Sequence, residues 1–408
     1  MSDCQFKFPT GWQVIPLDQC MGAIIDYRGK SPEKTTHGIP LITAKIVKNG
    51  WIEKPAEFIS VSDFDGWMRR GMPEPGDVVM TTEAPLGEIA QLDSRKVALA
   101  QRLITLRGKP ALLDNNFLKF AMQSEFIQQQ LKARATGTTV LGIRQSELRR
   151  VLLPVPPLAE QNDIAKCLGS LDGRIDLNRR MNETLEEIAR AIFKSWFGGF
   201  YPVSVADQRD GWKDGEFGDV AENIRIQVTP GSLPETTPYI GLEHMPRKSI
   251  ALTEWGTTES LASNKFAFKS GDILFGKLRP YFHKVGVAAV DGVCSTDVLV
   301  IRPKHPVWFS FVLGHASSSE MVDFTDAGST GTKMPRTSWD ELRRFKLSIP
   351  PSELAQTFNA AVFPLVQRIQ ANIHESRTLA SARDALLPKL LSGQLRIAQD
   401  PHATGVTL

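Results

Sequence analysis

One glycine-rich segment has the spacing of a phosphate-binding loop. Residues 271–277 read GDILFGK, which fits the GxxxxGK pattern. In such loops a Ser or Thr hydroxyl after the lysine binds the magnesium ion of the nucleotide, but Leu278 stands at that position. The segment also overlaps 273–275, which has the apolar character of a buried strand. We therefore expect no nucleotide site here.

Other residue types that support catalysis lack the spacing that catalysis needs. The seven histidines are dispersed, and no HxxxH or HExxH motif occurs, so the sequence does not favour a metal site. A GxSxG nucleophile elbow, an acidic nuclease cluster with Glu-x-Lys, a glycine-rich methyl-donor loop and an Asn-Pro-Pro-aromatic motif are also missing. The sequence therefore predicts a chain that is not catalytic by itself and holds no cofactor.

Length and composition indicate an ordinary globular protein of two to three domains. The 408 residues are 42% hydrophobic and 23% charged, which excludes intrinsic disorder and a collagen-like repeat. No apolar run approaches 18 residues, and the N-terminus lacks the pattern of a signal peptide, so we expect a cytoplasmic protein without a membrane span. The net charge of +3 neither establishes nor excludes binding to nucleic acid.

The four cysteines, Cys4, Cys20, Cys167 and Cys294, are far apart in the sequence. They form no CxxC pair, so they are typical of reduced thiols in a cytosolic protein.

The chain contains an internal duplication, which decides how the rest of the sequence is interpreted. Short segments recur in the same order, at spacings that drift in one direction from 200 to 194 residues, as small loop deletions would produce. The matched segments are Gly11-Trp12 with Gly211-Trp212, 75–79 with 270–274, Arg107 with Arg302, 147–150 with 341–344, and 155–157 with 349–351.

Each copy consists of a globular part followed by a long helical pattern. The globular parts contain short β-branched strands and a helical stretch at 118–131, so both are mixed α/β. The predicted division is 1–155, globular; 156–200, helix; 201–350, globular; 351–396, helix; and 397–408, tail.

Both helical patterns carry an apolar heptad seam with polar residues near the middle. The first seam contains Ile164, Leu168, Leu171, Ile175, Asn178, Asn182, Leu185, Ile192 and Trp196, and the second contains Val362, Leu365, Ile369, Asn372, Leu379 and Leu386.

A narrow seam suits a helical partner better than a broad globular surface, although each helix could instead pack on its own domain. We favour an antiparallel coiled coil between the two helices, in an α/β (α+β) fold with an internal pseudo-two-fold repeat. The buried Asn residues would disfavour slipped registers, in which they would lack a partner. Pro364 and Pro388 are expected to kink or end the second helix, and Gly169 and Gly173 to weaken the first.

Several segments resemble the specificity subunits of type I restriction-modification enzymes. The clearest is 153–161, LPVPPLAEQ, which follows 138–148 and looks like that family's boundary between recognition domain and conserved helix. The second copy, IPPSELAQ at 349–356, is similar but departs at Ser352 and Glu353. The likeness covers about 5–395 and includes the duplication and the order of domains and helices.

The resemblance implies a noncatalytic subunit that binds double-stranded DNA at a bipartite target. Each globular part would be a target-recognition domain that reads one half of the site, and the paired helices would set the spacer. Methyltransferase subunits would dock on the helices, and a motor-nuclease subunit would join them. S-adenosylmethionine, ATP and Mg would be bound by those partners.

The resemblance does not identify the DNA-contacting residues, so they are chosen by matched position and chemistry. Loops expected after equivalent strands contain Thr81 and Thr82 in the first copy and Lys277, Arg279 and Tyr281 in the second. Two further loops combine small hydroxyl side chains with a cation, which suits phosphate or base contact; they contribute Thr138, Thr139, Arg144, Thr330, Thr332, Lys333 and Arg336.

Two other functions fit part of the sequence. A duplicated coiled-coil scaffold that binds only proteins would retain its partners after these cations are neutralised. A nuclease or methyltransferase in a single chain would need motifs that we do not find.

Overall fold

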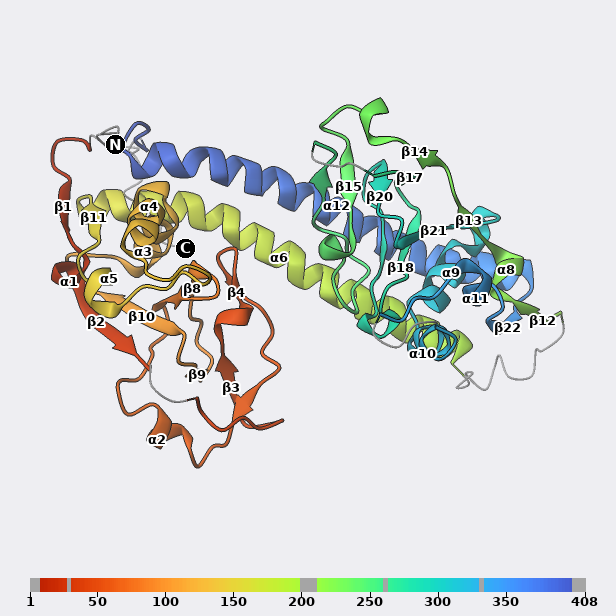
Figure 1. Cartoon of the computed structure of the whole chain (residues 1–408), viewed down its shortest axis with the longest axis horizontal. Helices are drawn as coiled ribbons and strands as arrows, with labels where there is room; N and C mark the ends of the chain where they lie inside the picture. The colour runs from red at the N-terminus through yellow and green to blue at the C-terminus, as the bar shows by residue number, and fades with distance from the viewer. Residues whose placement is uncertain (1–7, 28–30, 199–210, 260–262, 330–333, 398–408) are drawn as a thin grey trace, which may run out of the picture. The chain divides into compact units, whose positions relative to one another are not determined.

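The computed structural model describes residues 8–27, 31–198, 211–259, 263–329 and 334–397. The chain forms two compact units: unit 1 comprises residues 1–173 and 380–408, and unit 2 comprises residues 174–379. Figure 1 colours the chain along its length and labels the elements of both units. The two units are described separately below.

A four-stranded antiparallel sheet of order β2-β10-β7-β8 forms the centre of unit 1, and α3 contacts its strands. The elements of the globular part are β1 Gln13–Pro16, α1 Leu17–Cys20, β2 Met21–Asp26, β3 Ile39–Ile42, β4 Val47–Lys48, β5 Trp51–Ile52, β6 Phe58–Ile59, α2 Phe64–Trp67, β7 Val78–Thr82, β8 Leu86–Gln91, β9 Ala98–Leu99, β10 Leu103–Gly108, α3 Asn115–Gln123, α4 Glu125–Arg134, α5 Gln145–Leu148 and β11 Leu152–Val155.

Unit 2 is built around a sheet of the same order, β13-β21-β18-β19. Its elements are β12 Lys213–Glu216, α8 Phe217–Val220, β13 Ala221–Ile224, β14 Gln227–Val228, β15 Pro238–Ile240, β16 Gly256–Thr257, β17 Lys265–Phe268, β18 Ile273–Gly276, β19 Val285–Val287, β20 Gly292–Cys294, β21 Val298–Pro303, α9 Phe309–Ala316, α10 Ser319–Ala327, α11 Trp339–Leu342 and β22 Lys346–Ile349. Short 3₁₀ turns cover Ala44–Ile46, Pro230–Ser232, Leu242–His244, Pro280–Phe282 and Pro306–Trp308.

The duplication extends to the strand register. Leu103 of β10 lies opposite Thr81 of β7, and Val298 of β21 lies opposite Gly276 of β18. Each residue of the first pair is 195 positions before its counterpart in the second. The central sheets of the two copies therefore share one topology and one alignment.

The recurrent Pro-Gly-Asp and Ser-Gly-Asp segments have the same structural role in both units. Asp77 accepts two hydrogen bonds from Arg107, at 2.7 and 2.8 Å, and Asp272 accepts two from Arg302, both at 2.8 Å. Both carboxylates are buried, and each also accepts a backbone N–H three residues earlier in the chain. These ion pairs hold the turn before the central strand against the neighbouring strand of the sheet.

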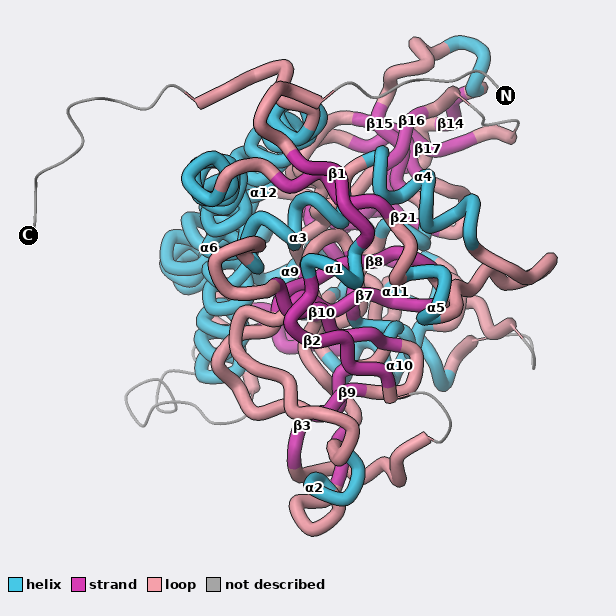
Figure 2. The backbone as a smooth tube through the Cα atoms, turned by 90° about the vertical axis from the view of Figure 1, so that its left-hand side faces the viewer, coloured by secondary structure: helices cyan, strands magenta, loops and turns pink. Residues whose placement is uncertain are grey.

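Two helices of forty residues, α6 Leu158–Phe197 and α12 Ser352–Leu391, contribute to both units. They run antiparallel within each unit. In unit 1, Arg383 donates to Asp172 at 2.9 Å, and in unit 2, Arg174 donates to Glu375 at 2.8 Å. Figure 2 shows the helices as neighbouring cyan coils.

One expectation about helices is narrowed by the structure, and one is wrong. Pro364 and Pro388 were expected to kink or end the second helix; neither ends α12, which continues past both. The stretch expected as one helix at 118–131 is two helices, α3 and α4, because Ser124 ends the first and caps the second. Its hydroxyl accepts the N–H of Ile127, and a side chain that binds free backbone groups in this way favours a new helix start.

Several features of the described residues concern the function classes considered above. Cys20, Cys167 and Cys294 are free thiols. Within the described ranges, no helix is long and apolar enough to cross a membrane. The same ranges contain no group of three or more His, Cys, Asp or Glu side chains that could hold a metal ion.

Candidate nucleic-acid interface and helix seam

The central strand of each sheet ends beside a later segment of the chain, and this junction has the same backbone geometry in both units. In unit 1, Ile143 N–H donates to the Thr82 carbonyl at 3.0 Å, and in unit 2, Thr337 N–H donates to the Lys277 carbonyl at 3.1 Å. The next residues also pair, as the antiparallel bridges Glu83 with Gly142 and Leu278 with Arg336. We call this junction the strand-end edge; it comprises 82–84 with 136–144 in unit 1 and 277–281 with 334–338 in unit 2.

The strand-end edge of unit 2 gathers cations that are far apart in the sequence. Lys277 is partly buried, and burial together with the positive charges of Arg225 and Arg336 lowers its pKa, against the opposing effect of Asp297. The carboxylate of Asp297 pairs with Arg336 at 3.4 Å. Positive charge thus exceeds negative charge around Lys277, and such a surplus favours an anionic ligand.

Arg279 and Tyr281 lie next to this cluster. Arg279 has a left-handed backbone (φ 52°), and its N–H donates to the Pro335 carbonyl at 2.8 Å. Its Nε is buried without a hydrogen-bond partner, whereas the side chain of Tyr281 is 49% exposed. The structure therefore brings together Lys277, Arg279, Tyr281 and Arg336, four residues that the sequence analysis selected.

The selected threonines of unit 1 are in a different environment. Thr81 and Thr82 were expected in a loop, but both belong to β7 and are 0% and 3% exposed. The Thr81 hydroxyl accepts the Glu88 N–H at 2.9 Å. That expectation was wrong, because the central strand continues two residues beyond its apolar run.

The other selected residues of unit 1 are on the surface. Thr138, Thr139 and Arg144 are exposed. Arg144 and Arg336 are not at matched positions: Arg144 precedes α5 at the cap position that Ser338 occupies before α11. Thr330, Thr332 and Lys333 lie outside the described residues.

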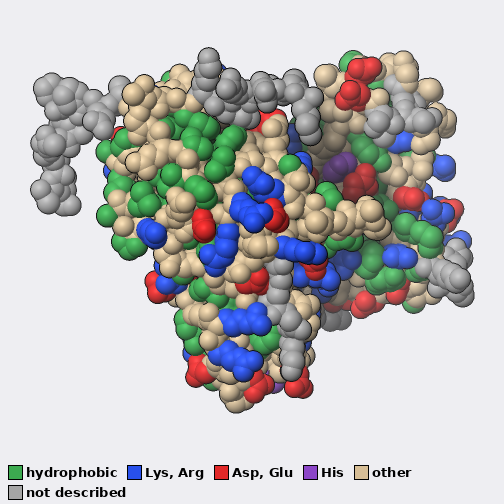
Figure 3. Space-filling model, turned by 60° about the vertical axis from the view of Figure 1, so that its left-hand side comes forward, with side chains coloured by type: hydrophobic (Ala, Val, Ile, Leu, Met, Phe, Trp, Pro, Cys, Tyr) green, Lys and Arg blue, Asp and Glu red, His purple; other side chains and the backbone are tan. Residues whose placement is uncertain are grey.

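Sequence reasoning missed three arginines. Arg102 pairs with Glu83 at 2.9 Å on the strand-end edge of unit 1. In unit 2, Arg225 is close enough to lower the pKa of Lys277, and Arg247 stacks 3.9 Å from the ring of Phe282. The duplication is a signal that could have identified Arg102: it stands 195 residues before Asp297, and 195 is the spacing of the matched segments in this region. On the face of unit 1 shown in Figure 3, Lys and Arg side chains are interspersed with Asp and Glu.

The predicted seam positions all face inward or are partly covered. In the first helix, Ile164, Leu168, Asn178 and Asn182 are buried, and Leu171, Ile175, Leu185, Ile192 and Trp196 are partly buried. In the second, Val362, Ile369 and Asn372 are buried, and Leu365, Leu379 and Leu386 are partly buried.

The polar residues of the seam pair with one another in unit 2. Asn372 donates to Asn182 at 2.8 Å, in a fully buried contact. Asn178 donates to Ser376 at 3.2 Å and to Glu375 at 3.1 Å. A shift by one heptad would separate these partners, so the pairs favour a single register.

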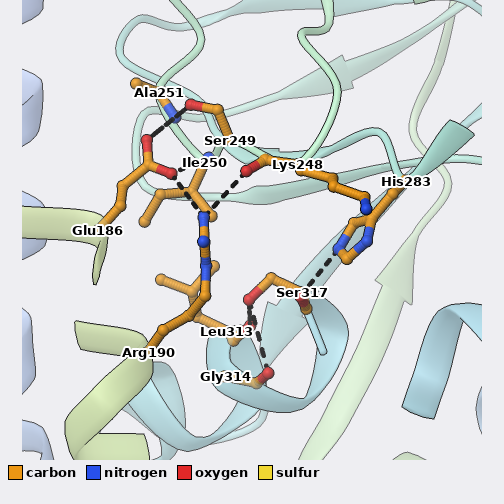
Figure 4. Close-up of polar contacts among 10 residues, drawn as sticks. All are labelled: Glu186, Arg190, Lys248, Ser249, Ile250, Ala251, His283, Leu313, Gly314 and Ser317. Carbon is orange, nitrogen blue, oxygen red and sulfur yellow. Dashed lines mark hydrogen bonds and ion pairs between the residues drawn. The ribbon is translucent and has the colours of Figure 1, made fainter. Parts of the chain in front are cut away.

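Polar contacts also attach α6 to the globular part of unit 2 (Figure 4). Glu186 is buried and accepts hydrogen bonds from the Ser249 hydroxyl at 2.6 Å and from the N–H groups of Ile250 and Ala251. Burial raises the pKa of this carboxyl, while the hydrogen bonds oppose that rise. Arg190 pairs with Glu186 and donates to the Lys248 carbonyl at 2.9 Å.

All of these residues except Ala251 line a cavity of about 1140 Å³ in unit 2. None of the selected DNA-binding residues is among those that line it. The candidate interface and this cavity are therefore separate sites.

The start of α6 is held to unit 1 by the segment that carries the family resemblance. Gln161 is completely buried; its side chain accepts the Asp114 N–H at 2.9 Å and donates to the Leu112 and Pro156 carbonyls. Glu160 accepts the indole N–H of Trp12 at 3.0 Å. Glu160 and Gln161 thus have a structural role: they orient the helix on its own domain.

Comparison with known proteins agrees with the duplicated arrangement. Residues 10–187 match the family model "Type I restriction modification DNA specificity domain". The chain is 26% identical to the type I restriction enzyme MjaIX specificity subunit of Methanocaldococcus jannaschii, over 96% of this chain and 95% of that protein. It is 27% identical to the HindI specificity subunit of Haemophilus influenzae, over 86% and 93%.

A solved structure has the same fold. The crystal structure of the type I restriction-modification S subunit from M. genitalium superposes with a TM-score of 0.60, at 16% identity, covering 95% of this chain and 98% of that one. The two mixed α/β domains, the two long packed helices and the matched sequences lead to one conclusion. The chain belongs to the specificity-subunit family of type I restriction-modification systems, the subunits that give these systems their DNA specificity.

Proposed function

We propose that this subunit recognises a bipartite site in double-stranded DNA, with the globular part of each unit reading one half. Catalysis resides in other subunits of the enzyme. The observation that carries the proposal is the strand-end edge, which has the same backbone pairing in both units but different side chains. A conserved framework with divergent side chains suits two different half-site sequences.

The unit 2 edge has the chemistry for direct contact with DNA. Lys277, Arg225 and Arg336 exceed the charge of Asp297, so the site can bind phosphate oxygens. Lysine and arginine also bond the O6 and N7 acceptors of guanine in the major groove. We therefore assign the base contacts of this half-site to Lys277 and Arg279, with Tyr281 and Arg336 beside them.

The unit 1 edge offers hydroxyl groups and fewer unpaired cations. Thr138 and Thr139 are exposed and can bond a base or a phosphate, and Arg144 adds a positive charge. Thr330, Thr332 and Lys333 remain proposed contacts of unit 2.

We assign the remaining roles by region. Residues 1–155 and 201–350 act as recognition domains, 156–200 and 351–396 as helices that set the spacer, and 397–408 as a tail. Methyltransferase subunits dock on the helices and a motor-nuclease subunit completes the complex. S-adenosylmethionine, ATP and Mg are bound by those partners, and the complex is cytoplasmic.

The decisive experiment compares the methylomes of the source strain with and without this gene, by long-read sequencing. We expect one split adenine-methylated motif to disappear on deletion and to return on complementation. Complementation with K277Q/R279Q should relax or abolish only one half of that motif. An unchanged methylome after deletion, with the partner genes shown to be expressed, would refute the proposed function.

A further inference from the structure

A closed loop on the strand-end edge of unit 1 presents two apolar side chains to solvent. Thr136 and Gly142 exchange backbone hydrogen bonds at 2.8 and 2.9 Å, which closes the loop 136–142. At its tip, Val140 is 52% exposed and Leu141 47% exposed. Among the large hydrophobic residues that are exposed in the described ranges, these are the only two adjacent in sequence.

The loop is fixed by its own backbone and by the core beneath it. Gly137 has φ +115°, and a Cβ there would lie 2.1 Å from the Val140 carbonyl oxygen, so only glycine permits this turn. After the loop, Ile143 is 2% exposed, and its N–H bonds the end of β7. The closed loop and the buried Ile143 therefore hold the side chains of Val140 and Leu141 towards solvent.

Unit 2 exposes an apolar residue at the matched position. Met334 precedes Arg336 by two residues, as Val140 precedes Gly142, and Gly142 and Arg336 make the equivalent bridges. Met334 and Val140 are each 52% exposed. The sequence before them is Thr-Gly-Thr in both copies, at 136–138 and 330–332, whereas the residues after them differ. Exposure of an apolar side chain is common to both.

Resting on the proposed function, we propose that Val140 and Leu141 in unit 1, and Met334 in unit 2, are apolar wedges that enter the DNA at each half-site. A contiguous exposed apolar patch rimmed by polar groups marks an interaction site. Here the rim carries cations and hydroxyls, Thr138, Thr139 and Arg144 in unit 1 and Lys277 and Arg336 in unit 2, and the carboxylates beside it, Glu83 and Asp297, are paired with arginines. These groups suit a polyanion rather than an apolar protein surface.

The wedges would have a defined task. Apolar side chains inserted at a base step unstack the bases and kink the duplex. An enzyme that modifies a base inside a duplex must first extrude it from the stack, and a base whose stacking is already weakened costs less to extrude. The specificity subunit would therefore prepare the DNA as well as select it.

The test uses the complex of this subunit with its methyltransferase subunits and a duplex carrying the motif found in the methylome. We would measure specific and nonspecific affinity, and the emission of 2-aminopurine placed beside the target adenine. For V140S/L141S, we expect specific affinity to fall about tenfold, the size of one lost base contact. The wild-type complex should raise 2-aminopurine emission when it unstacks the bases, and this rise should be absent in the variant. Nonspecific affinity and its salt dependence should stay unchanged, since no cation is removed.

The matched control is V61S, which removes an equally small apolar side chain that is 69% exposed elsewhere on unit 1; it should behave as wild type. The M334S variant should lower 2-aminopurine emission only at the half-site bound by unit 2. The V140I/L141I variant, which keeps apolar side chains, should show wild-type emission at the half-site bound by unit 1. Wild-type emission from V140S/L141S, or a variant that no longer assembles with the methyltransferase, would overturn the wedge. A wild-type complex without sequence preference would instead refute the proposed function.

Discussion

The strand-end edges of the two units have the same hydrogen-bonded backbone but opposite charge arrangements. In unit 1 the pair is Glu83 with Arg102, and in unit 2 it is Arg336 with Asp297. Arg102 and Asp297 are matched positions, so the charge on this site is inverted between the copies. The two copies share the backbone pairing, which the sheet requires, while the side chains on this edge diverged.

A second difference lies inside the units, where helix meets globular part. In unit 1, Asp172 is buried between Lys119, at 2.5 Å, and Arg383, at 2.9 Å. The matched positions of unit 2 are Val366, Leu313 and Ala189, which are all apolar. The same joint is therefore ionic in one unit and hydrophobic in the other.

The largest expected effect comes from breaking the ionic joint. D172A should lower the free energy of unfolding of unit 1 by about 3–5 kcal/mol. The change leaves Lys119 buried without its carboxylate and leaves Arg383 with only the exposed carboxylate of Asp384. Amide hydrogen exchange in α3 would measure the loss.

The matched control for that prediction converts the joint to the unit 2 residues, as K119L/D172V/R383A. This variant should recover most of the stability, because a well-packed apolar replacement of a buried ion cluster is often neutral or stabilising. Equal destabilisation of both variants would show that the joint depends on more than charge pairing.

The next effect is the pH dependence of unit 2. Burial lowers the pKa of His315 from its ordinary value of 6.5 to about 4, and its Nε2 has no hydrogen-bond partner. The unfolded chain therefore binds a proton that the folded chain excludes, so stability is lost as the pH falls from 6.5 towards 4. Relative to H315F, wild-type unit 2 should lose up to about 3 kcal/mol over that window.

Denaturant unfolding of both proteins at a series of pH values would check this prediction. Both proteins contain Glu186, so its contribution to the pH dependence cancels when the two stability curves are compared. Unit 1 has Ala121 at the position of His315, so amide exchange in α3 should show no difference between the two proteins. Parallel stability curves for unit 2 would contradict the assignment.

A smaller effect is expected on DNA recognition. K277Q should reduce specific affinity about tenfold and relax one half of the motif, because a lost lysine-to-guanine contact costs roughly 1–3 kcal/mol. The matched control is K269Q, which removes an exposed lysine of unit 2 paired with Asp291 at 2.7 Å. An equal loss in K269Q would indicate a general charge effect, and a change in both halves of the motif would contradict the division of labour between the units.

The smallest effect concerns the ion pair of the unit 1 edge. Arg102 and Glu83 are 50% and 44% exposed, so R102Q should change the stability of unit 1 by less than about 1 kcal/mol. Its effect on DNA binding should be smaller than that of R336Q, which removes a cation from the cluster around Lys277. Filter binding of the complex at several salt concentrations would compare them, and a larger loss for R102Q would reverse the ranking of the two edges.

The seam shows how far sequence pattern alone can determine structure. Periodicity identified the inward face of both helices, because a 3.5-residue repeat places the same side of a helix against its partner. The same pattern gave polar positions near the middle of each seam, and the structure pairs Asn182 with Asn372. The antiparallel direction was favoured on indirect grounds, and the contacts in both units confirmed it.

The interface was less predictable. Thr81 and Thr82 fit the chemistry of a DNA contact, but their burial depends on where the β7 strand ends, which local sequence specifies poorly. Arg225 and Arg247 had no motif to mark them, because they reach the cluster around Lys277 and Phe282 from other parts of the chain.

The sequence by itself therefore determined the duplication, the order of domains and helices, the seam and the family. All of these features depend on residue order and periodicity, which are present in the sequence before the chain folds. Only the tertiary structure decided which cations share one site, which threonines are buried, and how Asp172 and Glu186 fix the helices to their domains. Those outcomes depend on side chains far apart in sequence, whose distances and burial arise only when the sheets and helices pack.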